Sequence, residues 1–210
     1  MYDFIAIEGN IGAGKTSLST KIAQQFSARL ILEQFEDNAF LPKFYQDPQK
    51  YAFPLELSFL ASRYQQLKEQ LSSQELFHTL TISDYYIFKS LIFAKKTLQE
   101  DELALYTKLF NIINSTLPKP DLLVYLFVEV PRLKKNIITR GRSYEQDIEH
   151  EYLERIQRGY FDFIKQQTDL RILILDVNNI DFVHSESDYD KILDIIMQEY
   201  PVGIQRIEVK

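Results

Sequence analysis

Cysteine is absent from this chain of 210 residues, and so is tryptophan. Without cysteine the chain can form no disulfide, offer no thiolate to a metal and use no thiol as a nucleophile. The three histidines, His78, His150 and His184, lack the spacing typical of paired metal ligands. The lack of cysteine fits a reducing compartment, so we expect a cytoplasmic protein.

An excess of basic residues is also missing. Lysine and arginine number 24 against 30 acidic residues, which gives a formal net charge of -6 and a pI of about 5.2. Nucleic-acid binding depends on clustered lysine and arginine, so we expect no nucleic-acid partner, although local basic groups can still serve a small anion. No apolar run approaches the roughly 18 residues of a membrane span, so we expect no membrane partner.

What the chain has is apolar content of 45%, enough for one substantial core, and a length that fits a single domain of residues 1–210. Near-continuous short apolar runs, separated by helix-like stretches, indicate strands covered on both faces. The pattern predicts an α/β fold, a three-layer sandwich around a five-stranded parallel sheet. The predicted strands are Phe4–Ile7, Leu30–Leu32, Leu80–Ile82, Leu122–Val128 and Ile172–Val177, and the predicted helices are Ser17–Phe26, Pro54–Leu71, Asp101–Leu117, Pro131–Arg140, Glu149–Gln167 and Asp188–Tyr200.

A phosphate-binding motif lies between the first predicted strand and the first predicted helix. The stretch from Gly9 to Thr16, GNIGAGKT, fits the pattern G-x-x-x-x-G-K-[ST]. In such a loop, backbone N–H groups surround phosphate oxygens, the lysine reaches the outer phosphates of a nucleoside triphosphate, and the hydroxyl after it binds Mg²⁺. The alternative is a strand-to-helix turn that binds nothing. The residues expected at the nucleotide are Asn10, Ile11, Gly12, Ala13, Gly14, Lys15, Thr16 and Ser17.

Two acidic residues follow predicted strands, Glu33 in "RLILE" and Asp84 in "LTISD". Because parallel sheets bind ligands beyond the carboxyl ends of their strands, Glu33 is placed to take a proton from an acceptor hydroxyl. Asp84 would orient Glu33, hold Mg²⁺ through water, or do both. The alternative for either acid is a helix cap or a solvated loop position.

Arg140 and Arg142 flank Gly141 at the end of a predicted helix. Arginine forks bridge phosphate oxygens, and such a segment can close over a nucleotide and exclude water. The alternative is a favourable interaction of both charges with the helix dipole.

Four segments together resemble the deoxynucleoside kinase family. "IEGNIGAGKTSL" is similar to the family's phosphate loop, and "NAFLPKFYQDPQKYAFPLELSFLASRYQQL" resembles the substrate-binding stretch of its bacterial members. "RGRSYEQDIEHEYLERIQRGYFDFI" resembles the lid, and "LDVNNIDF" the segment beside the adenine of ATP. The resemblance implies a P-loop nucleoside-kinase architecture, ATP and Mg²⁺ as cofactors, a deoxynucleoside as substrate, and a homodimer.

The resemblance also implies a role for each matching residue. Glu33 matches the base for the 5′-hydroxyl, and Lys15 and Arg140 would act with it in catalysis. The remaining matches are Tyr45 and Glu145 at the sugar 3′-hydroxyl, Glu56 and Arg63 at the nucleobase, Phe93 stacked on that base, Arg140 and Arg142 at the phosphates, Thr16 and Asp84 at the metal, and Asp176 and Asn178 at the adenine of ATP.

The chain departs from the family pattern in three places. Asp84 is followed by Tyr85, where the family has arginine, so a cation near the 5′-oxygen is missing or comes from elsewhere. The gap in the alignment here leaves Phe88 as an alternative to Phe93. Gln34 stands where the family usually has proline after the base. Asn136 replaces the first lid arginine, with Lys134 or Lys135 as candidate substitutes.

Glu56, where the family usually has glutamine, bears on the nucleobase. A carboxylate only accepts hydrogen bonds, which suits amino groups or guanine N1–H and disfavours cytosine N3. We therefore expect deoxyadenosine or deoxyguanosine, unless Glu56 pairs with Arg63 or is protonated. The alternatives to this function are a nucleoside monophosphate kinase of the thymidylate kinase type and a catalytically weak nucleotide-binding sensor. Core packing is the alternative to a dimer for the apolar stripe between Leu91 and Ile113.

Overall fold

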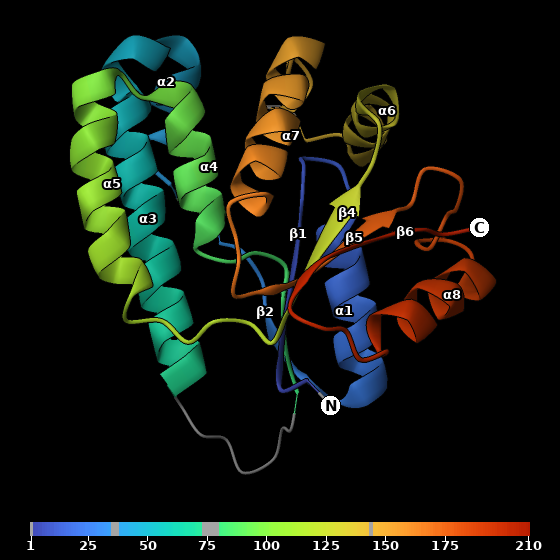
Figure 1. Cartoon of the computed structure of the whole chain (residues 1–210). Helices are drawn as coiled ribbons and strands as arrows, with labels where there is room; N and C mark the ends of the chain where they lie inside the picture. The colour runs from blue at the N-terminus through green and yellow to red at the C-terminus, as the bar shows by residue number, and fades with distance from the viewer. Residues whose placement is uncertain (1, 35–37, 73–79, 143–144) are drawn as a thin grey trace. The chain divides into compact units, whose positions relative to one another are not determined.

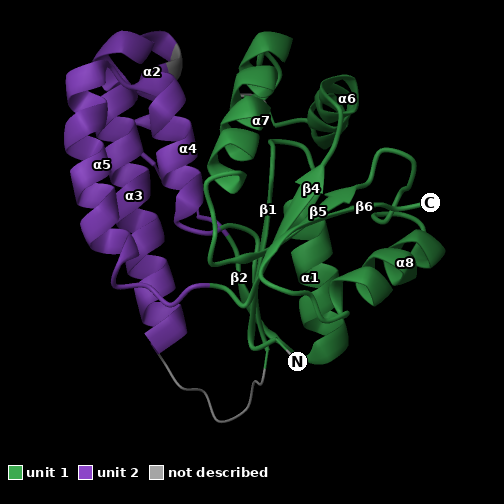
Figure 2. Ribbon diagram, viewed as in Figure 1, with its two compact units in different colours: residues 1–32, 76–85, 120–210 green, residues 33–75, 86–119 purple. Residues whose placement is uncertain are grey.

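The computed structural model describes residues 2–34, 38–72, 80–142 and 145–210, without the side chain of Tyr45. The chain divides into two compact units (Figure 2). Unit 1 consists of residues 1–32, 76–85 and 120–210, and unit 2 of residues 33–75 and 86–119. That residues 1–210 form one domain stays a prediction.

Unit 1 is built on a parallel sheet with the strand order β2-β3-β1-β4-β5-β6 (Figure 1). Every residue of β1 is buried, as expected of a strand covered on both faces. The carboxyl ends of the strands share one edge of the sheet because all pairs are parallel. The strands are β1 Phe4–Gly9, β2 Arg29–Ile31, β3 Thr81–Ser83, β4 Leu122–Phe127, β5 Arg171–Asp176 and β6 Gly203–Glu208.

Helices cover both faces of this sheet. Tyr125 of β4 packs on α7, with its ring centroid 5.1 Å from that of Tyr160. On the other face α1 and α8 lie side by side (Figure 1), joined by a hydrogen bond of 2.7 Å from the Tyr189 hydroxyl to the side-chain oxygen of Gln25. The predicted α/β fold is therefore confirmed. The helices of unit 1 are α1 Lys15–Phe26, α6 Val130–Arg140, α7 His150–Ile164 and α8 Glu186–Ile196.

The described residues form six strands in this sheet, so the prediction of five was wrong. The missed strand, β6, alternates half-buried and exposed residues, and among the strands in the described ranges it pairs with β5 alone. It therefore lacks the continuous apolar run by which the other strands were recognised. The last helix was also predicted too long, because α8 ends at Ile196 and the chain turns into β6 at Gly203, whose φ is 115°.

Unit 2 is helical in its described residues. Gln99 and Glu102 form a capping box at the start of α5, which satisfies N–H groups at that helix end. Buried Leu60 and Leu67 of α3 and Phe110 of α5 contribute to its apolar interior. The helices are α2 Leu41–Gln46, α3 Pro48–Ser72, α4 Phe88–Thr97 and α5 Glu100–Asn114.

Helix α3 begins at Pro48 and not at Pro54, because Pro54 is accommodated inside the helix. The prediction of a helix start at Pro54 was therefore wrong, and α3 tolerates the backbone hydrogen bond that an internal proline removes. Helices α2 and α4 were not predicted. Helix α2 has only six residues, and α4 buries polar as well as apolar residues, so its sequence lacks a one-sided apolar pattern. Among the described residues, no helix combines the length and apolarity needed to cross a bilayer.

Candidate active site

The phosphate loop connects β1 to α1 through glycines that cannot be replaced without strain. Gly12 has a φ of 82° and Gly14 a φ of 88°. A Cβ on Gly14 would lie 2.6 Å from the ring of Phe182, and one on Gly12 would lie 2.9 Å from the carbonyl oxygen of Leu133. The loop is thus closely covered by α6 and by the segment after β5, and its glycines provide the necessary space.

Asn10 and Lys15 fix the shape of this loop. The Asn10 side chain is buried, donates to the carbonyl of Leu153 at 2.8 Å and accepts from the N–H of Ile11 at 2.9 Å. The Lys15 ammonium donates to the carbonyl of Asn10 at 2.9 Å. Since charged phosphate oxygens are stronger acceptors than a carbonyl, a bound triphosphate would compete for this ammonium.

Thr16 and Asp84 meet beside the loop. The Thr16 hydroxyl donates to Oδ2 of Asp84 at 2.5 Å, although the two residues are 68 positions apart in the chain. A hydroxyl and a carboxylate are hard oxygen ligands of the kind Mg²⁺ takes together with waters and substrate phosphates. The described residues contain no group of three or more acidic, histidine or cysteine side chains that could hold a metal alone. The pair therefore fits a magnesium ion that shares its shell with a phosphate.

Arg140 and Arg142 both form ion pairs with Glu145. Arg140 makes a short contact to its Oε2, and Arg142 lies 3.5 Å from its Oε1. The resemblance to the family implies phosphate contacts for the two arginines and a sugar-hydroxyl contact for Glu145. The structure brings all three together, with about a third of each arginine side chain exposed, 36% and 31%.

Side chains of helix α6 contact both the phosphate loop and the segment around Glu145. Asn136, which stands where the family has a lid arginine, donates to the carbonyl of Gly12 at 2.9 Å. Lys134 donates to the carbonyls of Gln146 and Ile148 at 2.6 and 2.7 Å. In this structure Lys134 thus binds backbone carbonyls near Glu145. From the sequence it is a candidate substitute for the missing lid arginine.

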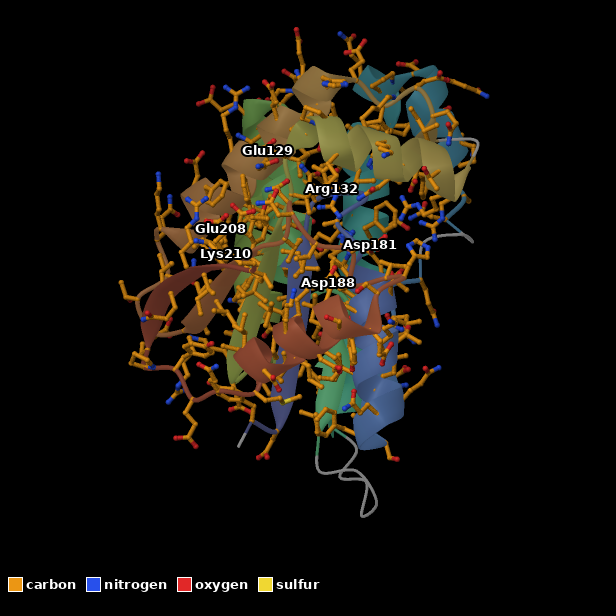
Figure 3. The ribbon with its side chains drawn as sticks, turned by 90° about the vertical axis from the view of Figure 1, so that its right-hand side faces the viewer. Glu129, Arg132, Asp181, Asp188, Glu208 and Lys210 are labelled. Atoms are coloured by element: carbon orange, nitrogen blue, oxygen red, sulfur yellow. The ribbon has the colours of Figure 1, made fainter. Side chains whose placement is uncertain are left out.

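The segment after β5 is held to the start of α6 by Arg132, labelled in Figure 3. Its guanidinium donates to the carbonyl of Val177 at 2.8 Å and makes short contacts to those of Asn178 and Ile180. Asn178 accepts from the N–H of Glu129 at 2.8 Å and donates to Asp176 at 2.6 Å. The side chains of Asp176 and Asn178, predicted at the adenine, thus shape the backbone of this segment.

In unit 2, Glu33 is held between two cations. Its Oε1 accepts from Nε and Nη2 of Arg63 at 2.9 and 2.7 Å, and its Oε2 accepts from the Lys89 ammonium at 2.5 Å. Burial alone would raise the pKa of Glu33, but the charges and hydrogen bonds of Lys89 and Arg63 outweigh it and hold the pKa well below the usual range. Glu33 is therefore ionised near neutral pH. Arg63, predicted at the nucleobase, also donates to Ser90 at 2.8 Å.

Glu56 is buried on α3, where its Oε1 accepts from the Thr97 hydroxyl at 2.9 Å. Burial raises the pKa of Glu56 from 4.5 to about 7, and the charge of Arg63 and the bond from Thr97 oppose this only in part. Arg63 directs its donors at Glu33 and Ser90. Near neutral pH, Glu56 is thus present in both its ionised and its neutral form.

The two candidate stacking residues occupy different surroundings. Phe88 is 4% exposed and packs edge-on against Tyr86, with ring centroids 4.6 Å apart. Phe93 is only half-buried, and the Lys89 ammonium lies 5.6 Å from its ring centroid. Tyr45 belongs to α2, but its side chain lies outside the described parts of the structure.

Sequence reasoning missed Lys89, Thr97 and Arg132. The sequence does contain a signal for Lys89, because it is the one charged residue in the apolar run YYIFKSLIFA from Tyr85 to Ala94. A buried lysine in such surroundings needs a partner of opposite charge. The sequence contains no comparable signal for Arg132, since a basic residue near the start of a helix is expected to be exposed to solvent.

A parallel sheet with helices on both faces, a glycine-rich loop leading from β1 into α1, and a hydroxyl–carboxylate pair beside that loop define a P-loop nucleotide-binding protein. The family model described as deoxynucleoside kinase matches residues 5–200. The chain belongs to the deoxynucleoside kinase family, which confirms both the recognition made from the motifs and the predicted kinase activity on deoxynucleosides.

Individual relatives agree with this assignment. The chain is 40% identical to deoxyguanosine kinase of Bacillus subtilis over 90% of its own length and 93% of the relative's. It is 30% identical to deoxyadenosine kinase of Dictyostelium discoideum, over 93% of the chain and 78% of that protein. The solved structure of M. mycoides deoxyadenosine kinase with bound dATP is similar with a TM-score of 0.78 and 26% identity, covering 93% of this chain and 100% of the other.

Proposed function

We propose that this enzyme transfers the γ-phosphoryl group of ATP to the 5′-hydroxyl of deoxyguanosine or deoxyadenosine. The observation that carries the proposal is Glu33, a largely buried carboxylate that Arg63 and Lys89 keep ionised. Only an ionised carboxylate can accept the proton that leaves the attacking hydroxyl. The 5′-oxygen then bonds to the γ-phosphorus as the bond to the β-phosphate oxygen breaks and ADP leaves.

On the donor side, residues 10–17 would surround the phosphates, with Lys15 at the outer ones. Thr16 and Asp84 would hold Mg²⁺, which when bound neutralises charge on the triphosphate. Arg140 and Arg142 would exchange Glu145 for phosphate oxygens, since both are partly exposed in their present ion pairs. Asp176 and Asn178 would act at the adenine by shaping the segment after β5.

On the acceptor side, Phe93 is the better candidate to stack on the nucleobase. Its side chain is half-buried, whereas that of Phe88 is buried and packs edge-on against Tyr86. Tyr45 and Glu145 would bind the sugar 3′-hydroxyl. Release of Glu145 from the arginines, when these bind phosphate, would make its carboxylate available as an acceptor.

Glu56 bears on the choice of nucleobase through both of its forms. Its ionised form accepts hydrogen bonds only, which matches the N1–H and amino group of guanine. Its neutral form also donates, which matches the acceptor nitrogen beside the amino group of adenine and equally that of cytosine, so only the ionised form favours a purine. A pKa of about 7 makes both forms accessible. The names of the relatives, deoxyguanosine kinase and deoxyadenosine kinase, support the same two substrates.

The test is transfer of labelled γ-phosphate from ATP to a panel of deoxynucleosides and nucleoside monophosphates. We expect transfer to deoxyguanosine and deoxyadenosine, and a loss of about 10²- to 10⁴-fold in kcat for Glu33→Gln. Glu69→Gln, an exposed change in the same unit, serves as the control. Transfer to monophosphates alone would indicate the thymidylate-like kinase, and nucleotide binding without transfer would indicate a sensor.

We further propose a cytoplasmic homodimer that serves nucleotide salvage. Leu105 and Ile112 of α5 lie one heptad apart, so they share a helix face, and they are 51% and 66% exposed. Apolar side chains exposed together in this way are typical of an interface. Light scattering of the parent and of Ile112→Glu tests this: we expect a dimer for the parent and a monomer for the variant.

A further inference from the structure

Lys89 occupies a costly position for a lysine. It is 8% exposed, and it is the second residue of α4, where the positive end of the helix dipole disfavours a cation. Burial of an ammonium group is unfavourable unless the charge is paired. Glu33 supplies that pairing at 2.5 Å.

The two oxygens of Glu33 are used differently. Oε1 receives two hydrogen bonds from Arg63, at 2.9 and 2.7 Å, which is the usual capacity of a carboxylate oxygen. Oε2 receives the bond from Lys89. A substrate hydroxyl that is accepted at Oε2 lies next to the ammonium group of Lys89.

We propose that Lys89 is a catalytic residue, whose ammonium group contacts the substrate 5′-oxygen and stabilises the negative charge that develops there as Glu33 takes the proton. The proposal rests on the proposed function and addresses the cation missing after Asp84. An ammonium group carries three protons, and Glu33 accepts one of them, so Lys89 can donate to both oxygens at once. Lys89 keeps its proton throughout, while the 5′-hydroxyl proton passes to Glu33 and the new O–P bond replaces the one to ADP.

This arrangement has a consequence for the pH dependence. The charged and titratable groups that act on Glu33 are Lys89 of α4 and Arg63 of α3, and Arg63 in turn is affected by Glu56 and by Tyr106 of α5. Lys89 and Arg63 hold the pKa of Glu33 low, so removal of Lys89 raises that pKa. The acid limb of the kcat/KM profile, which reports the free enzyme's base, should move to higher pH.

The experiment compares the parent with Lys89→Met, Lys89→Arg and Lys95→Met, with deoxyguanosine as acceptor, from about pH 4 to pH 9 around the ordinary glutamate pKa. Lys95 is an exposed lysine of the same helix and serves as the matched control. We expect Lys89→Met to lower kcat about 10²- to 10³-fold, as removal of one charge-stabilising donor does elsewhere. The variant should also show an acid limb within this pH range, whereas the parent, whose Glu33 has a pKa well below the usual range, should show none there. Lys89→Arg should keep the pH profile of the parent, because the charge is kept.

Thermal unfolding separates this role from a structural one. A Lys89→Met variant that is less stable but has the parent's acid limb and kcat would overturn the proposal. If Lys89→Met does not fold, Lys89→Arg decides, since a raised acid limb in that variant contradicts a purely electrostatic role of position 89. A parent that phosphorylates no deoxynucleoside would refute the proposed function, whereas an active parent with an equally active Lys89→Met refutes this inference alone.

Discussion

Thr16 and Asp84 are joined by a hydrogen bond of 2.5 Å, which brings the residue after the phosphate-loop lysine together with the residue after β3. The contact follows from the parallel pairing of β1 with β3, because both strands deliver their carboxyl ends to one edge of the sheet. We expect Asp84→Asn to raise the Mg²⁺ concentration needed for half-maximal activity about 10-fold, in the range of charged ligand contacts. A magnesium titration of initial rates measures it, with the exposed Asp190→Asn as control. An unchanged titration would exclude Asp84 from the metal site.

Arg132 gives a prediction for ATP affinity. Its contacts to three carbonyls fix the segment from Val177 to Ile180. Arg132→Met should raise the KM for ATP about 10-fold, since a charged hydrogen bond contributes about 1.5–3 kcal/mol, and leave the KM for deoxyguanosine nearly unchanged. Arg158→Met, at a side chain 68% exposed, is the control. Equal changes in both KM values would show that the arginine supports the whole fold instead.

Glu56 should make the folded state less stable as pH rises. Its folded pKa of about 7 lies above the ordinary 4.5, so between these values the unfolded chain has released a proton that the folded chain retains. Stability therefore falls across this window, by up to roughly 3 kcal/mol for one such group. Glu56→Gln should remove the effect, so its stability relative to the parent should be greater at pH 8 than at pH 5 in urea unfolding. A difference between the two proteins that does not depend on pH would contradict the assignment.

The same titration predicts a change in nucleobase preference. Ionised Glu56 favours guanine and neutral Glu56 favours adenine, so the ratio of kcat/KM for deoxyguanosine to that for deoxyadenosine should rise as pH increases through about 7. Competition between the two nucleosides at several pH values measures the ratio. Glu56→Gln should show a ratio nearly independent of pH, and a parent ratio without any such rise would argue against Glu56 as the residue that reads the base.

Gly14 provides a test of the loop's backbone. Gly14→Ala places a Cβ 2.6 Å from the Phe182 ring at a φ of 88°. A non-glycine residue in this conformation costs on the order of 1–3 kcal/mol, so we expect a lower melting temperature and weaker nucleotide binding. Adding Phe182→Leu should recover only the part due to the clash. Full recovery would mean that backbone strain at Gly14 is negligible.

The sequence was sufficient to predict the phosphate loop, because the spacing of the motif is local. The strand and the helix on either side of the loop follow from the periodicity of apolar residues. Glu33 and Asp84 could be placed at strand ends for the same reason. The two cations that contact Glu33 could not be predicted in the same way. Arg63 and Lys89 come from different helices, and one of these helices, α4, was not predicted. Arg63 was assigned to the nucleobase by resemblance, whereas its guanidinium binds Glu33 here. A side chain's partner depends on packing, which a one-dimensional pattern does not contain.

Strand β6 closes one side of the sheet, and its composition suits that position. The residues Gln205, Arg206 and Glu208 place polar and charged groups along the last strand in the order. Charges on an outer strand discourage pairing with other polypeptides. Removal of residues 203–210 would uncover β5, whose Ile172 to Leu175 are almost entirely apolar and buried. Shortened versions of this protein should therefore be prone to aggregation even where the phosphate loop is intact.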